Sequence, residues 1–172
     1  GVEPVRPAVE PAQVVGVDLE LRHNIQLDFL RKDMLGFLSR FFGDQVIAAA
    51  TGLYVPSWFM EGDAVLAETR FSRSGRGRSP AFEMELRAQV LEKGPWSYDK
   101  AVFGSYRDFV PDKYCLGYHI MGVHAAKRGM TFWREGLAAV SRNPLIPNPF
   151  NRKVQRLAGH GLSGLYTGRI PA

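Results

Sequence analysis

The sequence contains a single cysteine, and this scarcity limits what can hold the fold together. Cys115 has no partner for an internal disulfide. Its surroundings, Tyr-Cys-Leu-Gly-Tyr, predict a small buried side chain rather than a nucleophilic thiol. No run of about 18 apolar residues is present, so no membrane-spanning helix is expected. At 172 residues the chain is long enough to bury a sizeable hydrophobic core without a covalent cross-link.

Strand signals are scarce as well. Apolar and polar residues nowhere alternate convincingly, and no internal repeat is present. Residues 1–13 contain Pro4, Pro7 and Pro11 with little apolar periodicity, which predicts an extended proline-rich arm. The rest of the chain, residues 14–172, is expected to form one mainly α-helical domain.

Prolines, glycines and capping residues divide this domain into predicted helices. The first, 14–33, carries apolar residues on two stripes and is expected to be buried on both. The second, 34–53, is expected to break near Gly43. Further helices are predicted over 56–71, 80–93, 98–107, 111–129, 132–142 and 151–157, followed by a glycine-rich end.

The formal net charge is +5, and much of the excess lies in the segment RFSRSGRGRSP, residues 70–80. Its arginines suit phosphate groups, but Phe71 is its single aromatic for stacking on bases. Its glycines predict a flexible, solvated connection between helices. Nucleic-acid binding through this segment and through Arg152–Arg156 is therefore the weakest functional hypothesis, and nucleic acid is not the expected partner.

The first predicted helix carries two residues that are associated with metal chemistry. In the stretch LELRHN, Glu20 and His23 stand three positions apart, which places them on one face of a helix. The zinc-peptidase signature His-Glu-x-x-His uses this spacing: two imidazoles hold the metal, and the glutamate takes a proton from its bound water. Leu19 stands where the first histidine would be. Taken alone, the pattern equally fits a buried histidine beside a carboxylate.

A second segment makes the signature more specific. PSWFMEGDA, residues 56–64, resembles the Trp-x-x-Glu-Gly-x-Ala segment from which glutamate-type zincins supply their third zinc ligand. With ELRHNIQLDFL and NPFNRKVQRLAGHGLSGLY, the chain from about Val15 onward resembles a family of exported bacterial proteins. In that family, a zincin domain with the peptidase fold commonly precedes a β-propeller.

The resemblance assigns expected roles to individual residues. Glu20 matches the general base, His23 the second zinc ligand and Glu61 the third ligand. Asp63 and Glu68 are candidates to support these ligands through hydrogen bonds. Arg22 is a candidate to pair with a carboxylate, either near the site or on the surface.

Leu19 is the main departure from the family pattern. An isobutyl group has no lone pair, and losing a metal ligand should cost more than the 10–100-fold in affinity that losing a supporting residue typically costs. Zinc is therefore expected to bind weakly or not at all. His119 and His124 lie on a later predicted helix, either as replacement donors or as ordinary core or surface histidines.

The sequence also lacks a sheet that the zincin fold normally places before its zinc helix, since the proline-rich residues 1–13 cannot form one. The leading hypothesis is the helical part of a metallopeptidase-like domain with a degenerate, impaired or inactive site. The resemblance further implies a peptide or protein substrate, a C-terminal propeller in a longer chain, and export to the periplasm or cell envelope. The alternative is a non-catalytic binding or scaffold module of such an exported protein.

Overall fold

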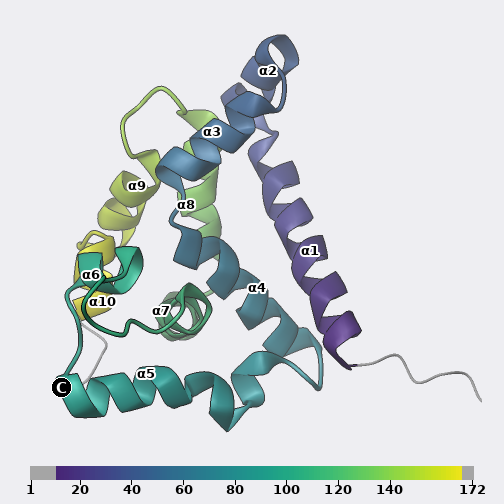
Figure 1. The fold of residues 1–172 in the computed structure, drawn as a ribbon. Coiled ribbons are helices and arrows are strands. Elements are labelled where there is room, and N and C mark those ends of the chain that lie inside the picture. Colours follow the sequence, from purple (N-terminus) through teal and green to yellow (C-terminus); the bar gives the residue numbers. More distant parts are fainter. Residues whose placement is uncertain (1–10, 168–172) are drawn as a thin grey trace, which may run out of the picture.

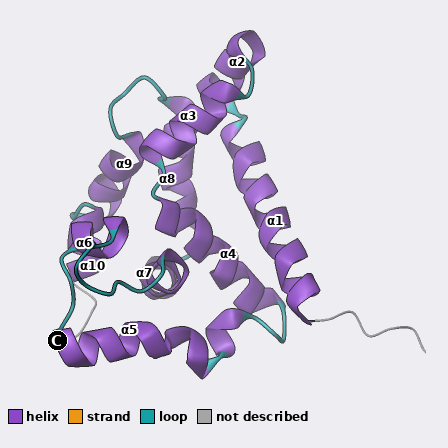
Figure 2. Ribbon diagram, viewed as in Figure 1, coloured by secondary structure: helices purple, strands orange, loops and turns teal. Residues whose placement is uncertain are grey.

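The computed structural model describes the backbone of residues 11–167 and the side chains of residues 20–167. This part of the chain is mainly helical and contains no strand, which confirms the predicted mainly α fold (Figure 2). No helix within it is long and apolar enough to cross a membrane. In chain order the helices are α1 (Pro11–Leu30), α2 (Asp33–Phe42), α3 (Gln45–Tyr54), α4 (Ser57–Phe71), the short 3-10 helix η1 (Arg76–Arg78), α5 (Pro80–Lys93), α6 (Tyr98–Phe103), α7 (Lys113–Arg128), α8 (Thr131–Arg142), α9 (Pro149–Ala158) and α10 (Leu162–Thr167).

Most helix ends follow local chemistry that the sequence already contains. Gly43 separates α2 from α3 with a φ of 75°, a conformation that favours glycine. Pro80 occupies the first turn of α5, and Gly94, with a φ of 73°, ends that helix. Asp112 caps α7 by accepting a hydrogen bond from the backbone N–H of Cys115 at 2.9 Å. The breaks at Gly43, Pro80 and Gly94 lie where the sequence predicted them, whereas α7 begins at Lys113, two residues after the predicted start.

Several predicted boundaries differ from the structure by a few residues, and the larger differences lie at both ends of the chain and in α6. Helix α1 begins at Pro11, because proline is tolerated in a first turn, so residues 11–13 belong to the helix and not to the arm. Residues 1–10 of the predicted arm lie outside the described residues. Helix α6 ends at Gly104, with a φ of 83°, and so does not extend to residue 107. Helix α10 forms in the glycine-rich end, where no helix was predicted.

Helices α4 and α7 cross at very close range, with α7 seen almost end-on beside α4 in Figure 1. Gly62 of α4 and Gly117 of α7 face each other at the crossing. A Cβ atom on Gly117 would overlap the carbonyl oxygen of Trp58, and one on Gly62 would overlap the backbone of Gly117. Glycine is therefore required at both positions, and the crossing sets how α4 is rotated within the fold.

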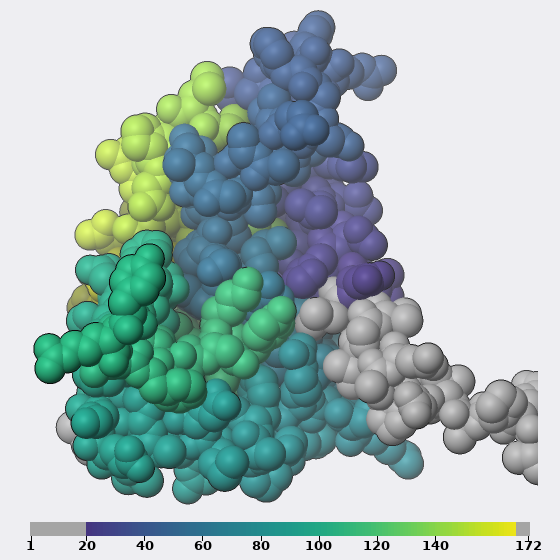
Figure 3. All heavy atoms as spheres, in the orientation of Figure 1, coloured from purple at the N-terminus to yellow at the C-terminus, as the bar shows by residue number. Residues whose placement is uncertain are grey.

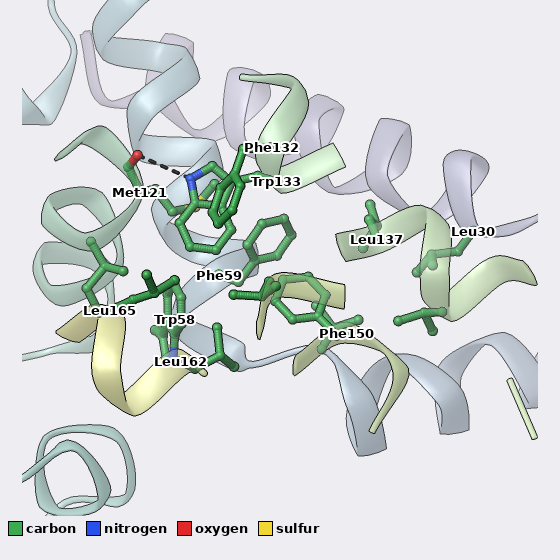
Figure 4. Close-up of a cluster of buried hydrophobic side chains, with 14 of the residues drawn as sticks. Leu30, Trp58, Phe59, Met121, Phe132, Trp133, Leu137, Phe150, Leu162 and Leu165 are labelled. Carbon is green, nitrogen blue, oxygen red and sulfur yellow. Dashed lines mark hydrogen bonds between the residues drawn. The ribbon is translucent and has the colours of Figure 1, made fainter. Parts of the chain in front are cut away.

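An aromatic cluster fills the core on the inner side of α4 (Figure 4). Trp58 packs edge-on against Trp133 of α8, with ring centroids 5.9 Å apart, and Phe59 packs against Phe150 of α9 at 4.9 Å. The indole N–H of Trp133 donates a hydrogen bond to the backbone carbonyl of Met121 at 3.2 Å. This cluster ties α4, α8 and α9 into one core and holds α4 in place.

Helix α1 packs against α4 and α8 along one side only. Leu30 and Gln26 are buried on that side, whereas Leu21 is 57% exposed and Ile25 is 49% exposed. The prediction that both apolar stripes of this helix are buried is therefore wrong for the described part of α1. The space-filling view shows the described side chains at the N-terminal end of the chain, in purple, beside the blue side chains of the helices that follow (Figure 3).

Candidate functional site

The candidate site lies where α1 packs against α4. His23 of α1 reaches toward Glu61 of α4, and its Nε2 atom lies 3.4 Å from Oε2 of the carboxylate. Both atoms are buried, and neither makes a hydrogen bond within the described residues. The side chain of Glu61 is 14% exposed and that of His23 is 31% exposed, so the exposed part of each side chain is not the atom that faces the other. An imidazole nitrogen and a carboxylate oxygen thus face each other in a partly buried position.

The second oxygen of the same carboxylate is held by a cation from α7. Nζ of Lys113 lies 3.1 Å from Oε1 of Glu61. The Glu61 carboxylate therefore lies between an imidazole and an ammonium group. Burial, and after it the negative charge of Glu61, raise the pKa of the neighbouring Tyr114 phenol. Sequence reasoning missed Lys113, because no local motif indicates which face of α7 meets α4.

The first two positions of the motif lie in the preceding turn of α1. Leu19 precedes His23 by four positions, so its Cα–Cβ bond projects from the same face of the helix one turn earlier. The side chain of Leu19 is outside the described side chains. Glu20, the predicted general base, is exposed and makes no ion pair or hydrogen bond with the described residues.

The residues at this site do not fit a tightly bound zinc ion. Zinc in proteins takes four ligands in structural sites and three protein ligands plus water in catalytic ones. His23 and Glu61 offer two donors, and among the described residues no group of three or more His, Cys, Asp or Glu side chains could hold a metal ion. Lys113 already brings a positive charge to the carboxylate. The roles of His23 and Glu61 as zinc ligands therefore stay predictions.

Asp63, two residues after Glu61, joins α4 to α1. It is 4% exposed and receives two hydrogen bonds from Arg22, from Nε to Oδ2 at 2.6 Å and from Nη2 to Oδ1 at 2.9 Å. Gln26 also donates to Oδ2 of Asp63 at 2.6 Å. Arg22 and Gln26 flank His23 on α1, so this network fixes the helix face from which His23 reaches Glu61.

Breaking this network is expected to destabilise the domain strongly. Replacing Arg22 with methionine leaves the buried Asp63 carboxylate without its cation, which should lower the free energy of unfolding by about 3 kcal/mol. Arg31→Met is the matched control, because Arg31 pairs at 2.8 Å with Asp44, whose side chain is 70% exposed. That loss should cost about 0.5 kcal/mol. Urea denaturation of both variants checks the difference, and equal stabilities would show that the Arg22–Asp63 pair does not hold α1 on α4.

Glu68, the other carboxylate expected to support the site, instead anchors the arginine-rich segment. Glu68 is 3% exposed, and its Oε1 accepts hydrogen bonds from the backbone N–H of Arg76 at 2.6 Å and from Nε of Arg76 at 3.0 Å. Arg78 donates to a backbone carbonyl of α4 at 2.7 Å. The prediction of a flexible, solvated connection is therefore wrong for η1, because a buried carboxylate needs a cation and donors beside it.

Two further histidines, His119 and His124, and the cysteine lie elsewhere. Nε2 of His119 is 3.6 Å from Oε1 of Glu83 on α5, and burial lowers the pKa of this imidazole while Glu83 opposes the shift. His124 is buried in the core, with Nε2 3.3 Å from the carbonyl oxygen of Leu165. Burial raises the pKa of the Cys115 thiol to about 12, which leaves it un-ionised at neutral pH. None of the three joins the candidate site.

Comparison with known proteins adds no family assignment to this geometry. No family model, no curated protein and no solved structure matches the chain. Function is therefore inferred from the residues themselves: a partly buried imidazole–carboxylate pair, an ammonium group on the same carboxylate, and an ion-paired network that fixes the two helices carrying the pair.

Proposed function

We propose that this chain is a zincin-like domain of the glutamate-type metallopeptidase family whose metal site is incomplete, and that it binds peptide or protein without hydrolysing it. One observation supports this proposal above all others. His23 and Glu61, which the resemblance pairs as zinc ligands, lie 3.4 Å apart, while Lys113 is bound to the same carboxylate and Leu19 provides no donor.

The chemistry of these groups explains the expected loss of activity. Peptide hydrolysis in a zinc peptidase needs a metal-activated water molecule and a Lewis acid that polarises the scissile carbonyl. An ammonium group can neutralise Glu61 and donate hydrogen bonds, but it has no open coordination position for water or a carbonyl oxygen. Lys113 thus brings to Glu61 the positive charge that a metal ion would bring. It does not supply the reactivity of the metal ion.

The resemblance also implies the kind of protein and the compartment in which the domain occurs. We propose that the domain belongs to a longer exported bacterial protein of the periplasm or cell envelope, in which a β-propeller follows it. Within such a protein, a domain with an inactive site acts as a binding or scaffold module. A peptide or protein partner is the ligand that the resemblance implies.

The nucleic-acid alternative is not favoured by the arginine-rich segment. Arg76 is committed to the buried Glu68, and Arg78 donates to a backbone carbonyl of α4. Phosphate binding needs basic side chains that are not already paired, and separating Arg76 from the buried Glu68 carboxylate would be costly. Two of the four arginines of the segment, Arg76 and Arg78, therefore serve the fold, which leaves the exposed Arg70 and Arg73 for any phosphate contact.

Metal content and peptidase activity test this proposal together. The purified protein, equilibrated with zinc and then desalted, is expected to contain much less than one zinc ion per chain. Its melting temperature should be the same with and without EDTA, because no bound metal contributes to stability. No turnover above that of a Glu20→Gln variant is expected on a mixed peptide library. Stoichiometric zinc together with EDTA-sensitive turnover that Glu20→Gln abolishes would contradict the proposal and show a working peptidase.

A further inference from the structure

A cavity of about 670 Å³ opens beside Glu61. The α3–α4 turn forms one wall, and α6, α9 and α10 form the others. Helix α6 packs against α10 at the left of Figure 1, so these walls belong to one packed unit. The volume lies within the roughly 300–1,000 Å³ of typical ligand sites. The cavity is thus large enough for a side chain and part of the backbone of a bound peptide.

The charge in this cavity is of one sign. Among the described residues, Glu61 and Asp99 are the two carboxylates that line it, and no lysine, arginine or histidine of residues 20–167 does. The Glu61 carboxylate is already engaged by Lys113 and His23. Asp99 is exposed and forms no ion pair with the described residues, so its charge is available to a ligand. The cavity therefore has room for about one positive charge, next to Asp99.

Aromatic rings accompany that carboxylate. Phe103 stands four positions after Asp99, on the same side of α6, and both line the cavity. The Phe103 ring is 84% exposed, and Tyr54 at the end of α3 lines the cavity as well. A carboxylate beside aromatic faces binds a guanidinium or ammonium group through an ion pair and cation–π contacts.

The chain itself uses this combination close by. Nζ of Lys100 lies 3.2 Å from the ring centroid of Trp96 and 2.6 Å from Oδ2 of Asp108. Lys100 thus binds the Trp96 ring and the Asp108 carboxylate together. Asp99 and Phe103 present the same two chemical groups toward the cavity, and no cation from the described part of the chain lines the wall beside them.

We infer that this cavity binds a basic side chain, an arginine or a lysine, of a peptide or protein partner. Asp99 receives the positive charge, and the Phe103 and Tyr54 rings cover the apolar stem of the side chain. The inference rests on the proposed function in one respect, namely that the ligand is a peptide.

The core provides a reporter for occupation of the cavity. Tyr98 lines the cavity, and its hydroxyl oxygen accepts a hydrogen bond from the indole N–H of the buried Trp58 at 3.1 Å. The indole N–H of Trp133 donates instead to Met121, away from the cavity lining. Filling the cavity should therefore shift the indole NMR signal of Trp58 and leave that of Trp133 in place.

The test is an NMR titration of the ¹⁵N-labelled protein with three capped tripeptides, Ala-Arg-Ala, Ala-citrulline-Ala and Ala-Glu-Ala. Arginine and citrulline have nearly the same shape, so their difference isolates the charge. We expect the arginine peptide to bind about tenfold more tightly than the citrulline peptide, a conservative figure for a charge-assisted contact. The glutamate peptide should not bind at all. Asp99→Asn should reduce arginine binding to the citrulline level, whereas Glu92→Gln, which removes a charge from exposed α5, should leave it unchanged.

The outcomes separate this inference from the proposed function. Equal binding of the arginine and citrulline peptides, no effect of Asp99→Asn, or an unmoved Trp58 signal overturns the cavity assignment while peptide binding itself stands. Failure of all three peptides to bind overturns the cavity assignment and also removes peptides from the proposed function. Affinity that falls from the arginine to the citrulline to the glutamate peptide, with signal shifts only at the cavity, supports both the cavity assignment and the proposed function.

Discussion

Replacing Gly117 with alanine is expected to lower the free energy of unfolding by about 3 kcal/mol, the upper end of the usual cost of overpacking a core. The added Cβ would overlap the carbonyl oxygen of Trp58 and come within 2.9 Å of the Cα of Gly62. Both are backbone atoms, so no side-chain rotation relieves the overlap, and α4 and α7 must move apart. Because Trp58 lies in the aromatic core, this movement also loosens its packing against Trp133. For a chain of this size, the melting temperature should fall by roughly 10 °C.

Gly122→Ala provides the matched control on the same helix. A Cβ at Gly122 would meet only Cδ1 of Leu66, at an ordinary van der Waals distance of 3.9 Å. Alanine is favoured over glycine inside a helix by up to about 1 kcal/mol, so this variant should be as stable as the native protein or more stable. Urea denaturation followed by circular dichroism measures both. If the two variants are equally stable, α4 and α7 do not cross at the distance described.

Replacing Leu19 with histidine is expected to tighten zinc binding by at least about 100-fold, since a missing metal ligand outweighs the loss of a supporting residue. Positions 19 and 23 are one turn apart on α1, and the carboxylate of Glu61 lies 3.4 Å from His23. The substitution therefore adds a third donor on the face that carries the first two. Isothermal titration calorimetry with zinc gives the affinities of the native and substituted chains.

The ion pair of Lys113 with Glu61 leads to a second expected result for zinc binding. The ammonium group of Lys113 holds Oε1 of Glu61 and repels a cation at the same carboxylate. Adding Lys113→Gln to Leu19→His should strengthen zinc binding by about a further tenfold, equivalent to about 1.4 kcal/mol. Leu21→His is the control, because Leu21 lies on the exposed side of α1 and cannot reach the pair. A gain in Leu21→His as large as that in Leu19→His would mean that zinc binds a surface histidine instead.

Local sequence chemistry accounts for most of the helices. The positive φ angles at Gly43 and Gly94 and the proline at position 80 act within a few residues, so the sequence alone predicts where α2 and α5 end or begin. The exposed side of α1 was not predicted, because the apolar pattern of Leu21 and Ile25 is typical of a buried face. Burial depends on which neighbours pack against a helix, and the pattern contains no information about them.

The candidate site likewise has features that the sequence predicts and features that it does not. The motifs around His23 and Glu61 directed attention to two residues that the fold places side by side, although what they bind remains a prediction. The ion pairs of Lys113 and Arg76 were not predicted. Lys113 reaches Glu61 only because two glycines let α7 cross close to α4, and Arg76 is ordered only because Glu68 is buried there. Such contacts depend on tertiary packing and leave no spacing signal in the sequence.

The sharpest test of the incomplete metal site is the position of zinc in crystals of the Leu19→His variant, found from anomalous scattering at the zinc absorption edge. We predict one strong peak at the α1–α4 contact, bound by the introduced imidazole, His23 and Glu61. Native crystals soaked in the same way should show no such peak there. The absence of zinc from this contact in the variant, with peaks only at other histidines such as His119 and His160, would contradict the assignment of His23 and Glu61 as the remaining ligands of a zincin.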